Sequence, residues 1–153
     1  MTALPTPTSG CFDGSVHRFA VRVYYEDTDA GGVVYHSNYL NWYERARSDM
    51  VSLLGIDQRA ALEAGEGAYA VSEVTIRYLS PARLDDVVQI ETRVDSLRAA
   101  SCRLSQRAMR GDTVLNEARL RIGFIDLSGR PKRQPDAWRK AFTAIFPDPE
   151  GQR

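Results

Sequence analysis

The feature that most constrains the fold is a series of alternating segments in the second half of the chain, joined by short connections. Apolar and polar residues alternate over residues 74–78, 88–95, 102–108 and 114–124. This period of two is typical of half-buried β-strands. Gly111 and Asp112 separate the last two segments and predict a hairpin turn. The connections are too short for the helices that join parallel strands, so a mainly antiparallel sheet is predicted.

A further strand is predicted near the N-terminus. From His17 onward the chain alternates again, and one face carries Phe19, Val21, Val23 and Tyr25. The pattern predicts that this strand ends at residues 26–27. Tyr25 is therefore expected to point in the same direction as the core residues of the strand.

A long helix is predicted from Tyr39 to Leu54, because apolar residues recur there at steps of three and four. Further apolar residues on its flank widen the stripe beyond what a surface helix needs, so we expect the sheet to wrap around this helix. Ser37 or Asn38 is expected to cap its start, and Gly55 to end it. The predicted fold class is α+β, an antiparallel sheet around one buried helix.

The chain has the length of one domain. With 153 residues it can bury about two-thirds of its unfolded surface without a metal or a disulfide. We predict a single domain over residues 17–146, a flexible lead-in over residues 1–16 and a tail over residues 147–153. The domain also contains a short predicted helix over residues 57–64 and a closing amphipathic segment.

Composition argues against several classes of function. Lys plus Arg (20) equals Asp plus Glu (20), so the broad positive charge that favours nucleic acid is absent. Cys11 and Cys102 form no C-x-x-C pair, which argues against a disulfide framework or a zinc site. No apolar run approaches the roughly 20 residues that span a bilayer, and no signal peptide is legible. We expect a cytoplasmic protein without a metal, a cofactor, a nucleic-acid partner or a membrane-inserted segment.

Candidate functional residues concentrate between the predicted strand end and the helix start. The pattern D-x-D-x-x-G-x-V-Y-H runs from Asp27 to His36. Further recognisable stretches are residues 44–47 on the helix, residues 78–86 before a strand and residues 130–131 after the last strand.

Together these motifs resemble the 4-hydroxybenzoyl-CoA thioesterase group, most closely its YbgC-like, Tol-Pal-associated acyl-CoA thioesterases. The resemblance covers most of residues 17–135. It implies the hotdog fold, an antiparallel sheet wrapped around a long central helix, in agreement with the fold predicted above. It also implies hydrolysis of acyl-CoA, or of a thioester on acyl carrier protein, at sites built between the subunits of a homodimer or homotetramer.

By motif position, the family's catalytic aspartate is Asp29, and its tyrosine and histidine are Tyr25 and His36. A positioned carboxylate can attack a thioester carbonyl or activate a water, provided that donors meet the developing oxyanion. Free N–H groups at a helix start are such donors. We assign Asp29 as nucleophile or general base, the backbone N–H near His36 as oxyanion donor, the His36 side chain as an orienting or proton-handling group, and Tyr25 as a positioning hydroxyl. Gly31 and Gly32 let the backbone pass close to the substrate.

These residues also have structural interpretations. Asp27 and Asp29 could form a turn and cap pair before the helix, and Asp27 is interpreted as structural. His36 could be a hydrogen-bonding residue of the cap region, and Tyr25 could serve packing alone.

Charged residues outside the loop have two interpretations as well. Glu44, Arg45 and Arg47 could line a site, but they are interpreted as solvated charges or an internal ion pair on the helix. Four basic residues are assigned to the phosphates of coenzyme A, with a solvated basic surface as the alternative: Arg83, Arg130, Lys132 and Arg133.

Other functions fit parts of the pattern. Asp27-x-Asp29 after an apolar strand resembles haloacid dehalogenase-like phosphatases, but their chemistry needs a downstream lysine on a parallel sheet, and the only lysines are Lys132 and Lys140. A calcium loop lacks its third ligand, and its twelfth position is Asn38. Two alternatives to the thioesterase stay open: a hotdog module that binds acyl-CoA or acyl carrier protein without catalysis, and a hotdog hydroxyacyl dehydratase.

Overall fold

The computed structural model describes residues 1–147 and contains a six-stranded antiparallel sheet. In chain order the strands are β1 (Cys11–Asp13), β2 (Val16–Arg22), β3 (Ala68–Tyr78), β4 (Val87–Leu97), β5 (Ser101–Arg110) and β6 (Thr113–Ile125). Across the sheet they follow the order β1-β2-β4-β5-β6-β3, which leaves β1 and β3 at the edges. Of the predicted tail over residues 147–153, all but Pro147 lies outside the described residues.

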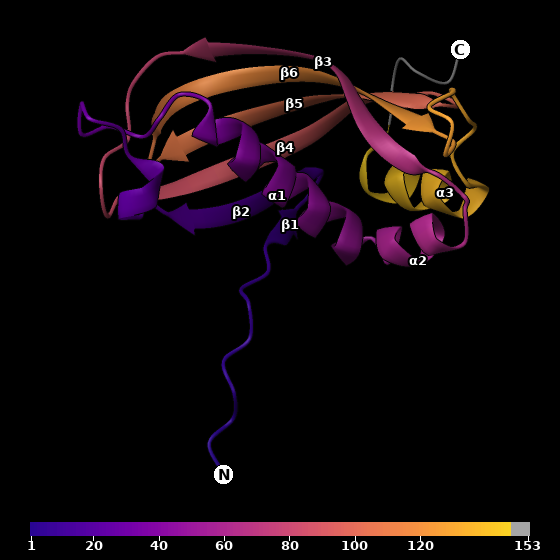
Figure 1. Ribbon diagram of the computed structural model, residues 1–153, viewed down its shortest axis with the longest axis horizontal. Coiled ribbons are helices and arrows are strands. Elements are labelled where there is room, and N and C mark those ends of the chain that lie inside the picture. The colour runs from indigo at the N-terminus through magenta and orange to yellow at the C-terminus, as the bar shows by residue number, and fades with distance from the viewer. Residues whose placement is uncertain (148–153) are drawn as a thin grey trace.

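The long helix α1 (Asn38–Leu53) lies against one face of the sheet, and the strands curve over it (Figure 1). Its aromatic residues Tyr39, Trp42 and Tyr43 are buried in one core with inward-facing strand residues. Gly55 follows the helix with a φ of 80°, the left-handed conformation that ends helices and suits glycine. The predicted long helix and the predicted α+β class are confirmed, and the arrangement is that of the hotdog fold.

Alternation along the strands places the core where the sequence predicts it. On β6, Leu120 and Ile122 are buried while Arg119 and Arg121 are exposed. β5 and β6 form a hairpin that turns at Gly111, whose φ is 56°. The predicted hairpin is therefore confirmed.

Two shorter helices close the end of the molecule where α1 ends. α2 spans Gln58–Glu63, and α3 spans Asp136–Ile145. A second apolar cluster joins α3 to the end of α1, and it contains Met50, Val51, Ile56, Phe142 and Phe146. Both predicted helical segments are present. No helix within residues 1–147 combines the length and the apolar composition that crossing a bilayer requires.

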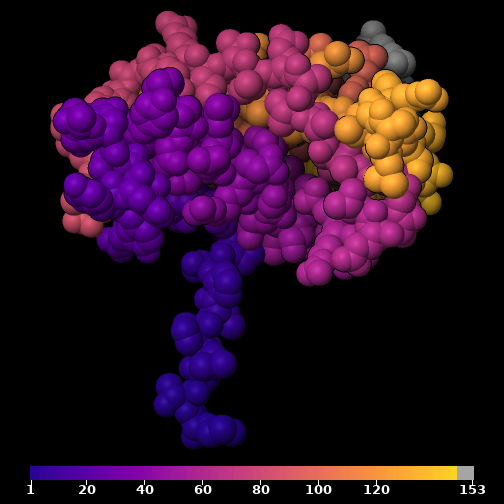
Figure 2. Space-filling model, in the orientation of Figure 1, coloured from indigo at the N-terminus to yellow at the C-terminus, as the bar shows by residue number. Residues whose placement is uncertain are grey.

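The ordered structure begins inside the segment for which a flexible lead-in is predicted. The first residues, indigo in Figure 2, extend away from the body, but β1 pairs antiparallel with β2, with Cys11 opposite Arg18. The Asp49 carboxylate on α1 accepts hydrogen bonds from the Ser9 hydroxyl at 2.6 Å and the Gly10 N–H at 3.0 Å. The segment therefore differs from the prediction from Ser9 onward, because a tertiary contact fixes it.

Tyr25 does not lie on the first long strand, and that prediction is wrong. β2 ends at Arg22, and Tyr25 begins a 3₁₀ turn, η1 (Tyr25–Asp27). Tyr25 is 85% exposed instead of pointing into the core. The Asp27 carboxylate accepts the Tyr24 N–H at 2.7 Å, so turn chemistry overrides the alternation that continues in the sequence.

Candidate active site

The loop between β2 and α1 folds into a tight turn around Asp29. The Asp29 N–H donates to the Val33 carbonyl at 2.9 Å, and the Gly32 N–H donates to the Asp29 carbonyl at 3.0 Å. Gly32 has a φ of 78°, which glycine adopts without strain. A bridge between Val33 and Arg83 attaches the loop to the connection between β3 and β4.

The Asp29 side chain is exposed and only partly used by the loop. Its Oδ1 accepts the Gly31 N–H at 2.8 Å. A Cβ atom added at Gly31 would lie 3.1 Å from this oxygen, so glycine leaves room for the contact. Within residues 1–147, Oδ2 of Asp29 has no hydrogen-bond or ion-pair partner. This carboxylate can therefore accept a proton or attack an electrophile.

Asp27, two residues earlier, uses both of its oxygens to hold the loop. Oδ2 accepts the Tyr24 N–H, and Oδ1 accepts the Asn38 side-chain amide at 3.0 Å. The Asp27 carbonyl accepts the Tyr35 N–H at 2.9 Å. These bonds connect η1 to the first residue of α1, which supports the structural interpretation of Asp27.

The start of α1 carries backbone N–H groups that no side chain caps. Ser37 occupies the N-cap position, but its hydroxyl makes no capping bond, and the Asn38 amide is directed to Asp27. In the described part of the chain, the N–H groups of His36 and Ser37 have no acceptor. Such groups, at the positive end of the helix dipole, suit a developing negative charge.

The His36 side chain is exposed beside this helix start and makes no hydrogen bond to another described residue. Its ring makes edge contacts with Tyr35 and Tyr78, with centroid distances of 4.7 and 6.3 Å. The Tyr25 hydroxyl likewise has no partner in residues 1–147. Asp29, His36, Tyr25 and both glycines thus lie in the segment between β2 and α1. The side chains of His36 and Tyr25 make no hydrogen bond within residues 1–147.

The four basic residues assigned to substrate binding lie at two separate places in the subunit. Arg83 lies beside the Asp29 loop through its bridge to Val33. Arg130, Lys132 and Arg133 lie in the connection between β6 and α3, at the opposite end of the molecule (Figure 1). The 16 residues of α1 span about 24 Å between these ends.

A cavity between the second half of α1 and the sheet was not predicted from the sequence. Its lining includes Glu44, Arg47, Cys102 and Leu104. The buried Arg47 forms an ion pair there with the exposed Glu44 one turn earlier on α1, so the ion pair on the helix is present and both of its residues also line the cavity. Burial raises the pKa of the Cys102 thiol to about 12, which keeps this side chain protonated and unreactive.

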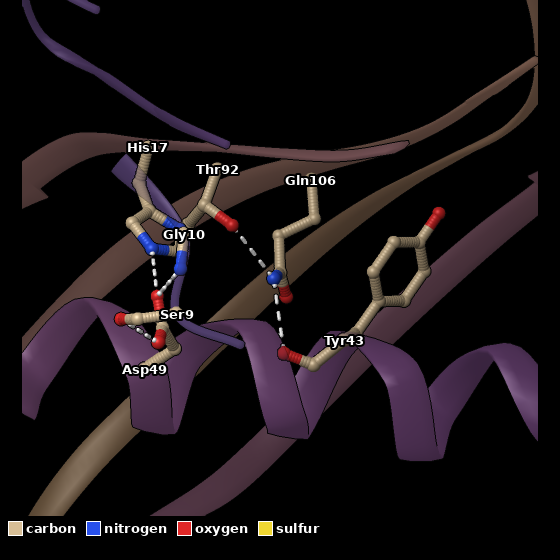
Figure 3. Close-up of polar contacts among 7 residues, drawn as sticks. All are labelled: Ser9, Gly10, His17, Tyr43, Asp49, Thr92 and Gln106. Carbon is tan, nitrogen blue, oxygen red and sulfur yellow. Dashed lines mark hydrogen bonds and ion pairs between the residues drawn. The ribbon is translucent and has the colours of Figure 1, made fainter. Parts of the chain in front are cut away.

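A buried polar network orients Arg47 at this cavity. Arg47 donates to the Gln106 side-chain oxygen at 2.9 Å. The Gln106 amide donates to the Thr92 hydroxyl at 2.9 Å and to the Tyr43 carbonyl at 3.1 Å (Figure 3). The signal that could have found Gln106 is its phase on β5, where it alternates inward with the buried Leu104. Among residues 1–147, no group of three His, Cys, Asp or Glu side chains is arranged to hold a metal ion.

The chain is similar to known proteins over most of its length. The model of the thioesterase-like superfamily matches residues 23–146. The acyl-CoA thioesterase YbgC of Haemophilus influenzae is 41% identical over 128 residues, which cover 84% of this chain and 92% of that protein. The acyl-CoA thioester hydrolase YbgC of Escherichia coli is 44% identical over 133 residues, which cover 86% of this chain and 96% of that protein.

A solved structure shows the same likeness. The crystal structure of a probable thioesterase from Bartonella henselae has a TM-score of 0.74 and 33% sequence identity, and the match covers 78% of this chain and 99% of that chain. Identity above 40% across most of the chain, together with the shared fold, shows the family of the chain. The chain belongs to the thioesterase-like superfamily and, within it, to the YbgC family of acyl-CoA thioesterases.

Proposed function

We propose that this chain hydrolyses acyl-CoA thioesters to a free acid and coenzyme A, with Asp29 as nucleophile or general base. One observation carries the proposal: a carboxylate with an unused oxygen lies in the same loop as an uncapped helix start. The names of the YbgC relatives, acyl-CoA thioesterase and acyl-CoA thioester hydrolase, support the choice of substrate. A thioester on acyl carrier protein presents the same carbonyl and is the alternative carrier.

The two roles of Asp29 differ in one step. As general base, Asp29 takes a proton from a water whose oxygen attacks the thioester carbonyl. As nucleophile, its carboxylate attacks the carbonyl itself and forms an anhydride, which water then cleaves. In both cases a tetrahedral oxyanion forms and the carbon–sulfur bond breaks, so that the thiolate leaves and takes up a proton.

Other residues of the loop have roles around this reaction. The N–H groups of His36 and Ser37 are the donors that we assign to the oxyanion. The His36 imidazole orients the substrate or delivers the proton to the leaving thiolate. The Tyr25 hydroxyl positions the thioester, and Gly31 and Gly32 leave space for the substrate to approach the backbone.

The exposed edge of the sheet supports a homodimer, or a tetramer built from two dimers. β3 is an edge strand, and its apolar residues Val71, Val74 and Tyr78 are 45, 38 and 46% exposed. An exposed apolar edge of this kind pairs readily with a second strand. Light scattering at assay concentration should find the activity in an oligomer; a fully active monomer would exclude this assembly.

Such a dimer would also give the distant basic residues a role. Ala68 of β3 pairs with Ile125, close to the basic connection, whereas Tyr78 ends the strand near the Asp29 loop. If two copies of β3 pair antiparallel about a two-fold axis, these opposite ends come together. The basic connection of one subunit, residues 130–133, then lies toward the Asp29 loop of its partner and can meet the phosphates of coenzyme A.

A hydrolysis assay with a panel of acyl-CoA and acyl carrier protein thioesters tests the function. Free-thiol detection should show release of the carrier by the wild-type protein and very little by an Asp29→Asn variant. A parallel assay for hydration of enoyl thioesters separates this activity from a dehydratase. Binding of acyl-CoA without thiol release across the whole panel would favour the non-catalytic module.

A further inference from the structure

Tyr78 connects the edge strand of the sheet to the candidate site. It is the last residue of β3, and its hydroxyl donates a hydrogen bond to the His36 carbonyl at 2.6 Å. The two residues are 42 positions apart in the sequence. This contact is the link between β3 and the short segment in front of α1.

The hydrogen bond restrains the peptide unit between His36 and Ser37, to which no other described residue makes a hydrogen bond. The flanking carbonyls have backbone donors: the Tyr35 carbonyl accepts the Asn38 N–H at 2.9 Å, and the Ser37 carbonyl accepts the Leu40 N–H at 3.1 Å. The His36 carbonyl instead depends on the Tyr78 hydroxyl. Because a peptide unit is planar, with its C=O and N–H pointing in opposite directions, holding the His36 carbonyl also sets the direction of the Ser37 N–H.

The same tyrosine limits the position of the His36 ring. The imidazole has no hydrogen-bond partner in residues 1–147, and it makes edge contacts with Tyr35 and Tyr78. The Tyr78 ring is itself held by Tyr39 of α1, with a centroid distance of 6.0 Å. Tyr78 therefore acts on two groups of the candidate site, the Ser37 N–H assigned to the oxyanion and the His36 imidazole.

We infer that Tyr78 is a positioning residue of the thioesterase site, which orients the Ser37 N–H through the His36 carbonyl and confines the His36 imidazole. The inference rests on the function proposed above. Burial raises the pKa of the Tyr78 phenol, so the hydroxyl stays protonated and able to donate at neutral pH. Since Tyr78 lies on the edge strand proposed for subunit pairing, the site and the subunit contact share a residue.

The first test is Tyr78→Phe, which removes only the hydroxyl. We expect kcat to fall roughly tenfold with KM nearly unchanged, because the lost bond orients groups that act in the transition state. Tyr43→Phe is the matched control: it removes a hydroxyl that is bonded to Asn116 in the core. That variant should lose thermal stability while its kcat per folded protein stays close to that of the wild type.

A second readout does not depend on activity. The chain has only two histidines, the buried His17 and the exposed His36, so imidazole NMR signals are simple to assign. Tyr78→Phe keeps the ring that contacts the imidazole but removes the bond to the His36 carbonyl, so it should shift the His36 signal and leave the His17 signal in place. Tyr43→Phe should leave the His36 signal unchanged.

The outcomes separate the two proposals. A wild-type kcat in Tyr78→Phe, an unmoved His36 signal, or a loss of activity that appears only together with dissociation of the oligomer would overturn the role of Tyr78. Absence of thioester hydrolysis in the wild-type protein would instead overturn the proposed function, while the NMR comparison would still decide whether Tyr78 positions His36.

Discussion

In the loop before α1, the exposed Asp29 carboxylate accepts one hydrogen bond, from the Gly31 N–H. Near the end of the same helix, the Asp49 carboxylate lies 2.7 Å from Nε2 of the fully buried His17 and also accepts the Ser9 hydroxyl and the Gly10 N–H (Figure 3). A carboxylate surrounded by donors is fixed in place and contributes to stability. A carboxylate with an unused oxygen is available for a reaction.

The surroundings of the two aspartates follow the same division. Beyond Asp49, α1 packs against α3 through a buried apolar cluster that includes Met50 and Phe142. Around Asp29, aromatic residues are exposed, and the helix start has no side-chain cap. The fixed contacts are thus concentrated near the end of α1, whereas the unsatisfied polar groups lie in the loop before α1 and at its start. Unsatisfied polar groups of this kind are expected at functional sites.

The largest expected effect is that of Asp29→Asn on catalysis. This change keeps the size of the side chain and removes its charge, so folding should survive while kcat falls on the order of a thousandfold. Asp27→Asn is the matched control, because it alters a carboxylate in the same loop whose oxygens hold the backbone. Its kcat should fall much less.

Steady-state thioester hydrolysis by both purified variants, each checked for oligomer size and thermal stability, decides the case. Equal penalties in the two variants would mean that disturbance of the turn explains the loss. Near-wild-type kcat in a folded Asp29→Asn protein would remove Asp29 from the mechanism.

The next effect concerns stability at the other end of the helix. Asp49→Asn leaves donors from Ser9, Gly10 and His17 without their charged acceptor. We expect the free energy of unfolding to fall by about 2 kcal/mol, because the buried His17 ring loses a charge-assisted bond and the Ser9 segment loses its anchor on α1. Urea unfolding measures this loss, and kcat of the folded variant should stay within about twofold of the wild type. A large loss of kcat at full stability would contradict the division between the two ends of α1.

Most elements of this fold could be predicted because they have a local signal; β1 and η1 could not. Alternation located the strands, and a wide apolar stripe located α1. The two failures have one physical origin, since side-chain hydrogen bonds redirect the backbone against its local pattern. Asp27 turns the chain at Tyr24 and takes Tyr25 out of the strand, and Asp49 orders Ser9 across 40 positions of sequence.

Prediction of the site was uneven for a similar reason. The motif names Asp29, His36 and Tyr25 because all three lie within residues 25–36, which a sequence pattern covers directly. Tyr78 belongs to the recognised stretch 78–86, but its role could not be found in this way, because its hydrogen bond to the His36 carbonyl depends on where a distant strand ends. The basic connection at residues 130–133 lies at the other end of the subunit, so its role depends on the assembly.

A smaller effect tests whether the far end of one subunit serves the site of its partner. Replacing Arg130, Lys132 and Arg133 together with alanine should raise KM for acyl-CoA roughly tenfold and change kcat little, because phosphate contacts hold the ground and transition states alike. Added salt should weaken binding to the wild type in the same way. An unaltered KM at low ionic strength would assign these residues to a solvated surface. Because Arg133 pairs with Asp136, an Asp136→Ala variant controls for the loss of that ion pair.

The smallest effect is the dependence of stability on pH at Asp49. Burial alone would raise the pKa of this carboxyl, but hydrogen bonds from Ser9, His17 and Gly10 outweigh it and lower the pKa below its ordinary value of 3.8. The unfolded chain therefore takes up a proton at a higher pH than the folded one does. The stabilisation that Asp49 contributes is fully present above its pKa in the unfolded chain, and it is lost as the pH falls through its pKa in the folded chain.

Asp49→Asn cannot take part in this titration, so its unfolding free energy should fall less steeply on acidification than that of the wild type. The difference in stability between the two proteins should consequently shrink between neutral pH and the acid side of the ordinary value. Urea unfolding of both proteins over this range measures it, and every other carboxyl group is common to the pair. A stability difference that stays constant with pH would show that the charge of Asp49 does not contribute to holding its donors. The contrast between a charged structural aspartate, Asp49, and a charged reactive one, Asp29, would then fail.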